Sequence, residues 1–198
     1  MKKVFFEDVV FAVKNLVHAA SSLTPSCERA LEIALNEEKN FNARFALDTI
    51  LTNNALAKSE DLPVCQDTGM AVFFVEYGGD VVFVGGEFED AINEGVRQGY
   101  KEYGYRASVL DPITRKNTGD NTPTVVHVKI VKGDNVKISF MAKGFGSENM
   151  SKLFMLTPSK GIEGVKNAVL QAVKEAGANP CPPIVVGVGI GGTAEKAM

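Results

Sequence analysis

The sequence predicts an α+β protein, with an N-terminal helical layer followed by antiparallel β-hairpins and mixed helices. Two observations predict this class. Apolar residues recur at helical spacing within residues 4–59. Further along, two pairs of short apolar runs are each separated by a turn-forming segment, which is typical of hairpins. This order of elements favours α+β over a doubly wound parallel sheet.

Three helices are expected in the N-terminal layer. The first has apolar residues on one face, at Val9, Val10, Val13, Leu16 and Val17. Thr24-Pro25 provides a capping hydroxyl before a proline at the first helical position, so a second helix is expected through about Leu35. A third is expected from Asn42 to Lys58. Cys27, at the start of the second helix, is interpreted as a small apolar filler.

The middle of the chain predicts two hairpins around a helix. Met70–Tyr77 and Val81–Val84 are apolar runs joined by a turn at Gly78-Gly79-Asp80. A helical pattern follows over Glu87–Tyr103, and a polar, turn-rich stretch covers Asp111–Thr124. The second expected hairpin consists of two apolar strands joined by a turn: Val125–Val131, the turn Lys132–Asn135, and Val136–Ala142.

The C-terminal part predicts a helix over Ser159–Ala176, a buried strand over Ile184–Val188, and the opening of another helix at Thr193–Met198. Gly187–Gly192 fits the G-x-G-x-x-G dinucleotide pattern, but the acidic residue expected about 20 positions later has no room in the sequence. The pattern stops inside a helix, so we expect a single domain over residues 1–198 that is incomplete at its C-terminal end.

Composition excludes several classes of protein. The 198 residues are 45% hydrophobic with a net charge of −3, which argues against a nucleic-acid binder. No run of about 18 apolar residues predicts a membrane span, and the N-terminus lacks the apolar core of a secretory signal, so a cytoplasmic protein is expected. The three cysteines, Cys27, Cys65 and Cys181, form no CxxC pair, so neither a disulfide framework nor a zinc ribbon is expected.

Four polar segments could bind a ligand or could simply be turns. Val64-Cys65-Gln66-Asp67-Thr68-Gly69 sets a thiol beside an amide and a carboxylate, although an ordinary turn explains Asp67–Gly69 equally well. Arg106 and Arg115 flank a polar stretch and could pair with carboxylates, or could lie on a solvated loop. Lys143–Met150 contains glycines that could let backbone N–H groups approach an anion. Asn179-Pro180-Cys181-Pro182-Pro183 holds a thiol between prolines, or is a rigid connector.

Together these segments resemble the class I, iron–sulfur-dependent fumarase and L-tartrate dehydratase family, in its alpha or N-terminal-type subunit. The resemblance spans nearly the whole chain. Its most specific pieces occur in the family's order, at residues 64–69, 117–123, 143–149 and 181–183.

The resemblance implies a hydro-lyase, a carbon–oxygen lyase of the fumarate hydratase type and of the tricarboxylic acid cycle. It would remove water from a 2-hydroxy dicarboxylate such as malate and, in reverse, add it to fumarate. The implied cofactor is a [4Fe-4S] cluster held by three cysteines, with one open iron acting as a Lewis acid. By matching motif, Cys65 and Cys181 are cluster ligands. Gln66, Asp67 and Arg106 would contact substrate, and Gly146 would offer its backbone N–H.

The sequence departs from the family in one respect: the third cysteine ligand lies beyond its last residue, and Cys27 matches no family ligand. The resemblance implies that the proton-abstracting residue belongs to the beta subunit or C-terminal domain, so no residue of this sequence is assigned that role. We therefore expect the chain alone to be inactive, and to act in an oligomer with that partner. The alternatives are an L-tartrate dehydratase subunit and a non-catalytic module that only binds a partner.

Overall fold

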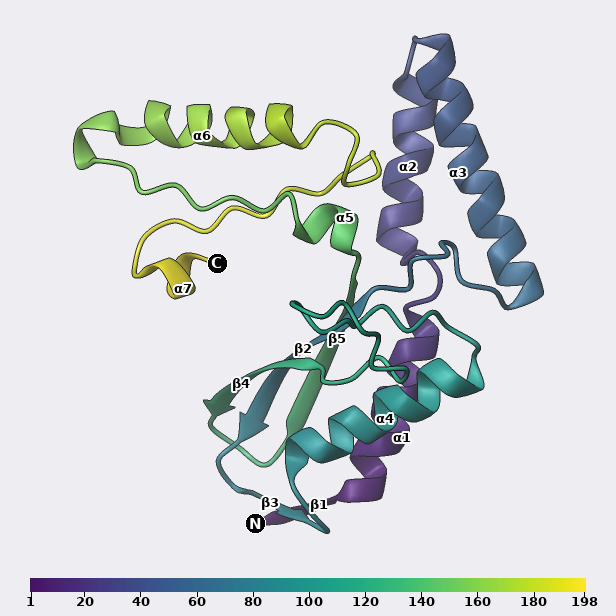
Figure 1. Cartoon of the computed structure of the whole chain (residues 1–198), viewed down its shortest axis with the longest axis vertical. Coiled ribbons are helices and arrows are strands. Elements are labelled where there is room, and N and C mark those ends of the chain that lie inside the picture. Colours follow the sequence, from purple (N-terminus) through teal and green to yellow (C-terminus); the bar gives the residue numbers. More distant parts are fainter. The chain divides into compact units, whose positions relative to one another are not determined.

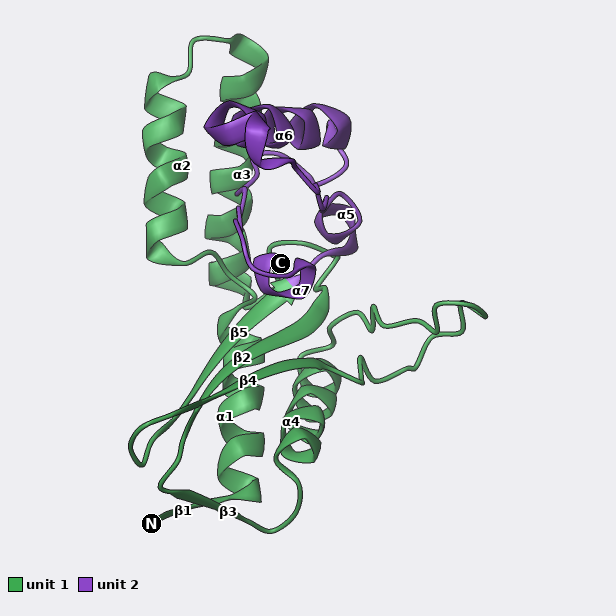
Figure 2. Cartoon of the chain, turned by 90° about the vertical axis from the view of Figure 1, so that its left-hand side faces the viewer, with its two compact units in different colours: residues 1–142 green, residues 143–198 purple.

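The computed structural model describes residues 1–198, in two compact units, Met1–Ala142 and Lys143–Met198 (Figure 2). We call them unit 1 and unit 2 and describe each by itself. Unit 1 holds these elements: β1 (Lys2–Phe5), α1 (Phe6–Ala19), α2 (Pro25–Glu37), α3 (Phe41–Glu60), β2 (Met70–Gly78), β3 (Val81–Val84), α4 (Phe88–Glu102), β4 (Val125–Val131) and β5 (Val136–Lys143). Strand β5 ends one residue inside unit 2. Helices and strands together confirm the predicted α+β class.

The three N-terminal helices are confirmed, although Val4 and Phe5 belong to a strand instead of the first helix. The Thr24 hydroxyl accepts from the Cys27 N–H at 3.3 Å and caps α2, as its position before Pro25 predicts. Asn40 caps α3 by accepting from the N–H groups of Asn42 and Ala43. Arg44 donates to the Leu35 carbonyl at the end of α2, so α2 and α3 form a helical hairpin (Figure 1).

The core of unit 1 lies between a sheet and two helices. Helices α1 and α4 lie side by side against one face of the sheet (Figure 1). Their buried apolar faces and that of β2 form one cluster: Val9, Val10, Val13, Val17, Ala71, Phe73, Val75, Ala91, Ile92, Val96 and Tyr100. Gly95 makes the close helix contact possible, because a Cβ there would lie 2.6 Å from the Cβ of Val13.

The two predicted hairpins are wrong. Strand β3 pairs in parallel with β1 instead of with β2, from Lys2 opposite Val81 to Phe5 opposite Val84. The three-stranded sheet has the order β4-β2-β5, so β2 separates the strands of the second expected hairpin. Strand β2 is parallel to β4, with Val72 opposite Val125. Two side-chain contacts give the direction of β5: Glu76 pairs with Lys137, and Phe73 contacts Phe140. Residue numbers therefore rise along β2 as they fall along β5, so β5 is antiparallel to β2.

The reason for this topology is the burial of β2. Ala71, Val72 and Phe73 are buried in succession, on both faces of the strand, as expected of a central strand. The expected turn after β2 bonds to the connection between β4 and β5 instead. The Gly78 N–H donates to the Asn135 carbonyl at 2.9 Å, and the Asp80 N–H donates to the Gly133 carbonyl at 2.9 Å. The connection therefore crosses the end of β2.

Unit 2 consists of short helices and extended segments: α5 (Phe145–Glu148), a 3₁₀ turn (Pro158–Lys160), α6 (Gly161–Ala176) and α7 (Ala194–Ala197). The predicted helix over residues 159–176 is confirmed. The predicted buried strand over 184–188 is wrong: the segment forms no strand, and Val185 is 96% exposed. A strand is stabilised by pairing with a neighbour, and unit 2 contains only the last residue of β5, so residues 184–188 find no partner.

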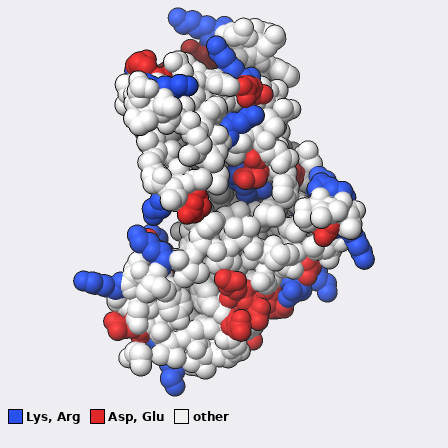
Figure 3. Space-filling model, turned by 60° about the vertical axis from the view of Figure 1, so that its left-hand side comes forward, with Lys and Arg blue, Asp and Glu red and all other residues white.

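Two surface properties bear on function. None of the helices combines the length and apolarity needed to cross a membrane. On the face drawn in Figure 3, basic and acidic side chains are scattered, with one acidic group in its lower part. No broad basic area covers that face, in keeping with the net charge of −3.

Candidate active site

A pocket of about 170 Å³ lies in unit 1 where the end of α1, the segment before β2 and the end of α4 meet. Its polar side is formed by Cys65, Asp67 and Thr68, and its other walls are largely apolar or aromatic. The lining residues are Val17, Ala20, Ser21, Pro63, Val64, Cys65, Asp67, Thr68, Tyr100, Tyr105, Phe140 and Ala142. An apolar pocket with a few converging polar groups is the usual form of a small-molecule site.

A larger hollow, about 430 Å³, lies beside Phe6 and α4 and contains none of the predicted site residues. Its one cationic side chain, Arg97, is already engaged by carboxylates on two sides. Arg97 pairs with Glu94 and donates to Asp120 at 3.0 Å. The smaller pocket is therefore the better candidate, because it brings together a thiol and a half-buried carboxylate.

The segment containing Cys65 is anchored at its start. The Val64 N–H donates to the Ser21 carbonyl at 2.9 Å, just after α1. The Asn53 side chain, on α3, donates to the Val64 carbonyl at 2.8 Å. These two bonds tie Val64 to both helices. The Cys65 side chain is exposed and donates to the Gln66 side-chain oxygen at 3.6 Å, so the thiol and the amide are in contact.

Asp67 is held by two donors on one of its oxygens. Its Oδ1 accepts from the Gly69 N–H at 3.1 Å and from the Ser108 hydroxyl at 3.3 Å. Arg106 joins the same region through its backbone, because its carbonyl accepts from the Thr68 hydroxyl at 3.1 Å. Its guanidinium is exposed and is not among the pocket-lining groups. The structure thus brings Cys65, Gln66, Asp67 and the Arg106 backbone together.

Tyr100 and Asn121 support this region, although neither was among the predicted site residues. Tyr100 lies on the buried face of α4, where its pattern is that of a core residue. Its hydroxyl lies 2.9 Å from the Thr68 carbonyl and 3.1 Å from the Gly69 carbonyl, to which it donates. Burial, with smaller contributions from Tyr105 and Asp67, raises the pKa of Tyr100 well above its usual range. Asn121 lies in the 117–123 segment, which carries part of the family resemblance but whose composition is also that of a turn.

We expect the pH dependence of stability above about pH 10 to reveal the Tyr100 phenol. There the unfolded chain releases the Tyr100 proton while the folded chain keeps it, so the unfolding free energy falls as the pH rises. The slope contributed by one group is at most about 1.4 kcal/mol per pH unit. Urea unfolding across this range should show a shallower fall for Tyr100→Phe than for the unchanged chain. Equal slopes would contradict the assignment.

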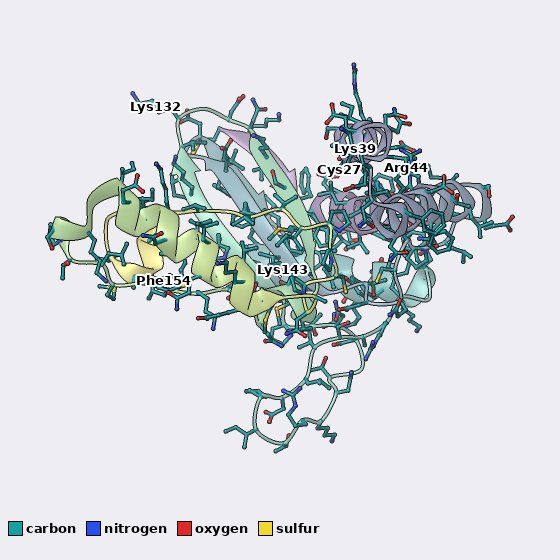
Figure 4. All side chains as sticks on the ribbon, turned by 90° about the horizontal axis from the view of Figure 1, so that it is seen from above. Cys27, Lys39, Arg44, Lys132, Lys143 and Phe154 are labelled. Atoms are coloured by element: carbon teal, nitrogen blue, oxygen red, sulfur yellow. The ribbon has the colours of Figure 1, made fainter.

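Gly146 and the segment of Cys181 meet within unit 2. Gly146 lies in α5, where a Cβ would stand 2.6 Å from the Asn179 carbonyl oxygen, so only glycine allows this approach. Cys181, two residues after Asn179, is exposed and has a left-handed backbone at φ 56°. Its N–H donates to the Ala178 carbonyl at 3.2 Å. Cys27 is on α2, within the helical hairpin of unit 1 (Figure 4), and its exposure contradicts the interpretation as a buried filler.

The chain by itself does not assemble a complete metal site. All three cysteines are free thiols, and no three His, Cys, Asp or Glu side chains gather where they could hold a metal ion. Two of the thiols, Cys65 and Cys181, stand beside polar segments in separate units. The residues of neither unit therefore form a complete cluster site by themselves.

A small pocket that brings a thiol and a carboxylate together in an α+β chain is typical of proteins that bind small molecules. Residues 11–198 match the family described as fumarate hydratase (Fumerase), and the chain belongs to this family. The expected membership of the fumarase family, which the resemblance of the four polar segments indicated, is thereby confirmed.

Individual relatives carry two kinds of name. A Methanocaldococcus jannaschii protein with the provisional name L(+)-tartrate dehydratase subunit alpha is 40% identical over 96% of this chain and 68% of its own length. The anaerobic class I fumarate hydratase of Escherichia coli is 33% identical over 98% of this chain and 36% of its own. The Escherichia coli L(+)-tartrate dehydratase subunit alpha is 32% identical over 75% of this chain and 50% of its own. The chain spans half or less of these last two relatives.

Proposed function

We propose that the complete protein is a hydro-lyase that removes water from a 2-hydroxy dicarboxylate such as malate and, in reverse, adds it to the unsaturated product fumarate. The observation that carries this proposal is the meeting of Cys65 and Asp67 at one pocket, in a chain of the fumarate hydratase family. The pocket is small, as suits a substrate of this size. Removing water from such a molecule requires a good leaving group and the abstraction of a weakly acidic C–H proton.

The proposed roles come from the family resemblance, and the contacts of Asp67 support them. Gln66 and Asp67 contact the substrate, and one oxygen of Asp67 is already held by Gly69 and Ser108, which fixes the direction of the other. The exposed Arg106 guanidinium is free to move onto a substrate carboxylate and pair with it in bidentate fashion. Gly146 offers its backbone N–H. The aromatic walls formed by Tyr105 and Phe140 limit the water around the substrate.

Cys65 and Cys181 would provide two of the thiolates for a [4Fe-4S] cluster, which when bound supplies a Lewis acid for the leaving hydroxyl. We propose that the third thiolate and the proton-abstracting group come from outside these 198 residues. A beta subunit, of the kind implied by the names of the alpha-subunit relatives, is the proposed source of the proton-abstracting group. Inactivity of the chain alone, oligomer formation, a cytoplasmic location and a role in the tricarboxylic acid cycle stay predictions.

The three cysteines provide the test, with Cys27 as the matched control because it is equally exposed. The complete protein is reconstituted anaerobically with iron and sulfide. We expect a brown species with a cluster signal in electron paramagnetic resonance after oxidation. Cys65→Ser and Cys181→Ser should lose that signal and their bound iron, whereas Cys27→Ser should keep both. If Cys27→Ser abolished the signal, the proposed ligand set would be wrong.

L(+)-tartrate is the second candidate substrate, favoured by the 40% identity to a relative with a tartrate dehydratase name. Malate and tartrate differ by one hydroxyl, so the pocket alone does not select between them. Turnover of malate and of both tartrate enantiomers by the complete protein with its partner decides the matter. Turnover of malate alone supports the fumarate hydratase proposal, and turnover of one tartrate enantiomer alone replaces it.

A further inference from the structure

Asn121 is the most completely buried polar residue near the pocket, with a side-chain amide that is bonded on both ends. It is 0% exposed and its backbone is left-handed, at φ 60°. Its Oδ1 accepts from the Ser108 N–H at 2.7 Å and from the Val109 N–H at 3.2 Å. Its Nδ2 donates to the Gly69 carbonyl at 3.1 Å. One amide thus satisfies three buried backbone groups.

These three groups belong to the two segments that carry the proposed substrate contacts. Gly69 ends the segment that begins at Cys65, and Ser108 follows Arg106 by two residues. The same two segments are joined directly, since Ser108 donates to Asp67 and Thr68 donates to the Arg106 carbonyl. Asn121 therefore lies behind a cross-linked platform formed by residues 67–69 and 106–109. Asn121 is absent from the pocket wall, although its amide adjoins the hydroxyl of Tyr100, which lines the pocket.

We infer that Asn121 is a positioning residue: its amide fixes Ser108 against Asp67 and holds the Gly69 end of the Cys65 segment. The role of the platform in catalysis rests on the proposed function, whereas the hydrogen bonds are observed independently of that function. Few residues could replace Asn121. The position needs an acceptor for two N–H groups, a donor for one carbonyl, and tolerance of a left-handed backbone, which asparagine combines.

Two variants separate the backbone requirement from the amide. Asn121→Gly keeps the left-handed backbone and removes the whole amide. Asn121→Asp keeps the acceptor for Ser108 and Val109, and it replaces the donor to Gly69 with an oxygen of an ionisable carboxyl. The matched control is Asn93→Ala, because the amide oxygen of Asn93 also accepts from a backbone N–H, that of Thr124 at 3.0 Å, which lies outside both platform segments.

Hydrogen exchange of the 198-residue chain is the first measurement. The Ser108 and Val109 amides should exchange at least about tenfold faster in Asn121→Gly, since each loses a buried partner. Asn121→Asp should restore most of their protection. Asn93→Ala should leave both unchanged. Protection equal to the unchanged chain in Asn121→Gly, with circular dichroism showing a folded protein, would overturn the inference. So would a failure of Asn121→Asp to restore any protection.

Steady-state kinetics of the complete protein with its partner is the second measurement. A displaced Asp67 should lower kcat by roughly 100-fold, with a much smaller change in KM. Asn121→Asp should recover part of kcat, which a loss of general stability would not explain. Wild-type kcat in Asn121→Gly overturns the inference even if the proposed function holds. If the unchanged protein lacks hydro-lyase activity while the variants show the exchange pattern above, only the proposed function is overturned.

Discussion

Replacing Phe73 by alanine should lower the free energy of unfolding of the chain by about 3–5 kcal/mol. Phe73 is 0% exposed, in the middle of β2, and its ring lies 5.0 Å from that of Phe140 on β5. It belongs to the cluster that joins the sheet to α1 and α4. Its loss leaves a cavity that the rigid backbone of a central strand cannot fill. Urea unfolding followed by circular dichroism measures the difference.

The neighbouring residue supplies the control for that substitution. Phe74 points to the opposite face of β2, is 47% exposed, and stacks on His127 at 5.1 Å. Phe74→Ala removes a ring of the same size but leaves no enclosed cavity, so its cost should be about 1 kcal/mol. Equal losses for the two variants would show that the described face of β2 is not the one that packs against the helices.

Gly78→Ala should destabilise the chain by roughly 2–3 kcal/mol, although it adds only one methyl group. Gly78 lies at the end of β2, where the connection between β4 and β5 crosses. A Cβ there would lie 2.4 Å from the Gly133 carbonyl oxygen and 2.8 Å from that of Asn135. Both obstacles are backbone atoms, which cannot rotate away as a side chain can. Relief therefore requires moving the connection, which breaks the hydrogen bonds that hold it to β2. Urea unfolding again provides the measure.

Gly79→Ala is the adjacent control. A Cβ at Gly79 meets only the Val131 carbonyl oxygen, at 3.6 Å, which is an ordinary contact. This variant should change the unfolding free energy by less than about 0.5 kcal/mol. If Gly78→Ala were as mild as Gly79→Ala, the connection would not cross the end of β2, and the sheet order β4-β2-β5 would need revision.

The sequence predicted the helices better than the pairing of the strands. Helical periodicity is a local signal, and caps such as Thr24 and Asn40 act within three residues. Strand pairing depends on residues far apart. The turn at Gly78–Asp80 has the composition of a hairpin turn, yet its backbone groups bond to residues 131–135. Nothing within the 70–84 segment could have indicated that β3 would pair with β1.

The candidate site was predictable in part for the same reason. The segment around Cys65 has an unusual grouping of thiol, amide and carboxylate, which local chemistry could single out but could not distinguish from a turn. The agreement of four such segments with one family favoured a binding site over a simple turn. The family match over residues 11–198 supports that interpretation. The roles of Tyr100 and Asn121 were not predicted, because Tyr100 resembles a core residue and Asn121, although it lies in the 117–123 motif, resembles a turn residue.

The sequence alone determined the α+β class, the helices, and the membership of Cys65 and Cys181 in family motifs. These properties depend on residue type and short-range order. The tertiary structure decided that β2 is a central strand, and it brought Asp67, Ser108 and Asn121 into one hydrogen-bond network. Such contacts join residues up to 52 positions apart. They form because buried backbone groups must find partners, and the fold, not the local sequence, determines which partners are within reach.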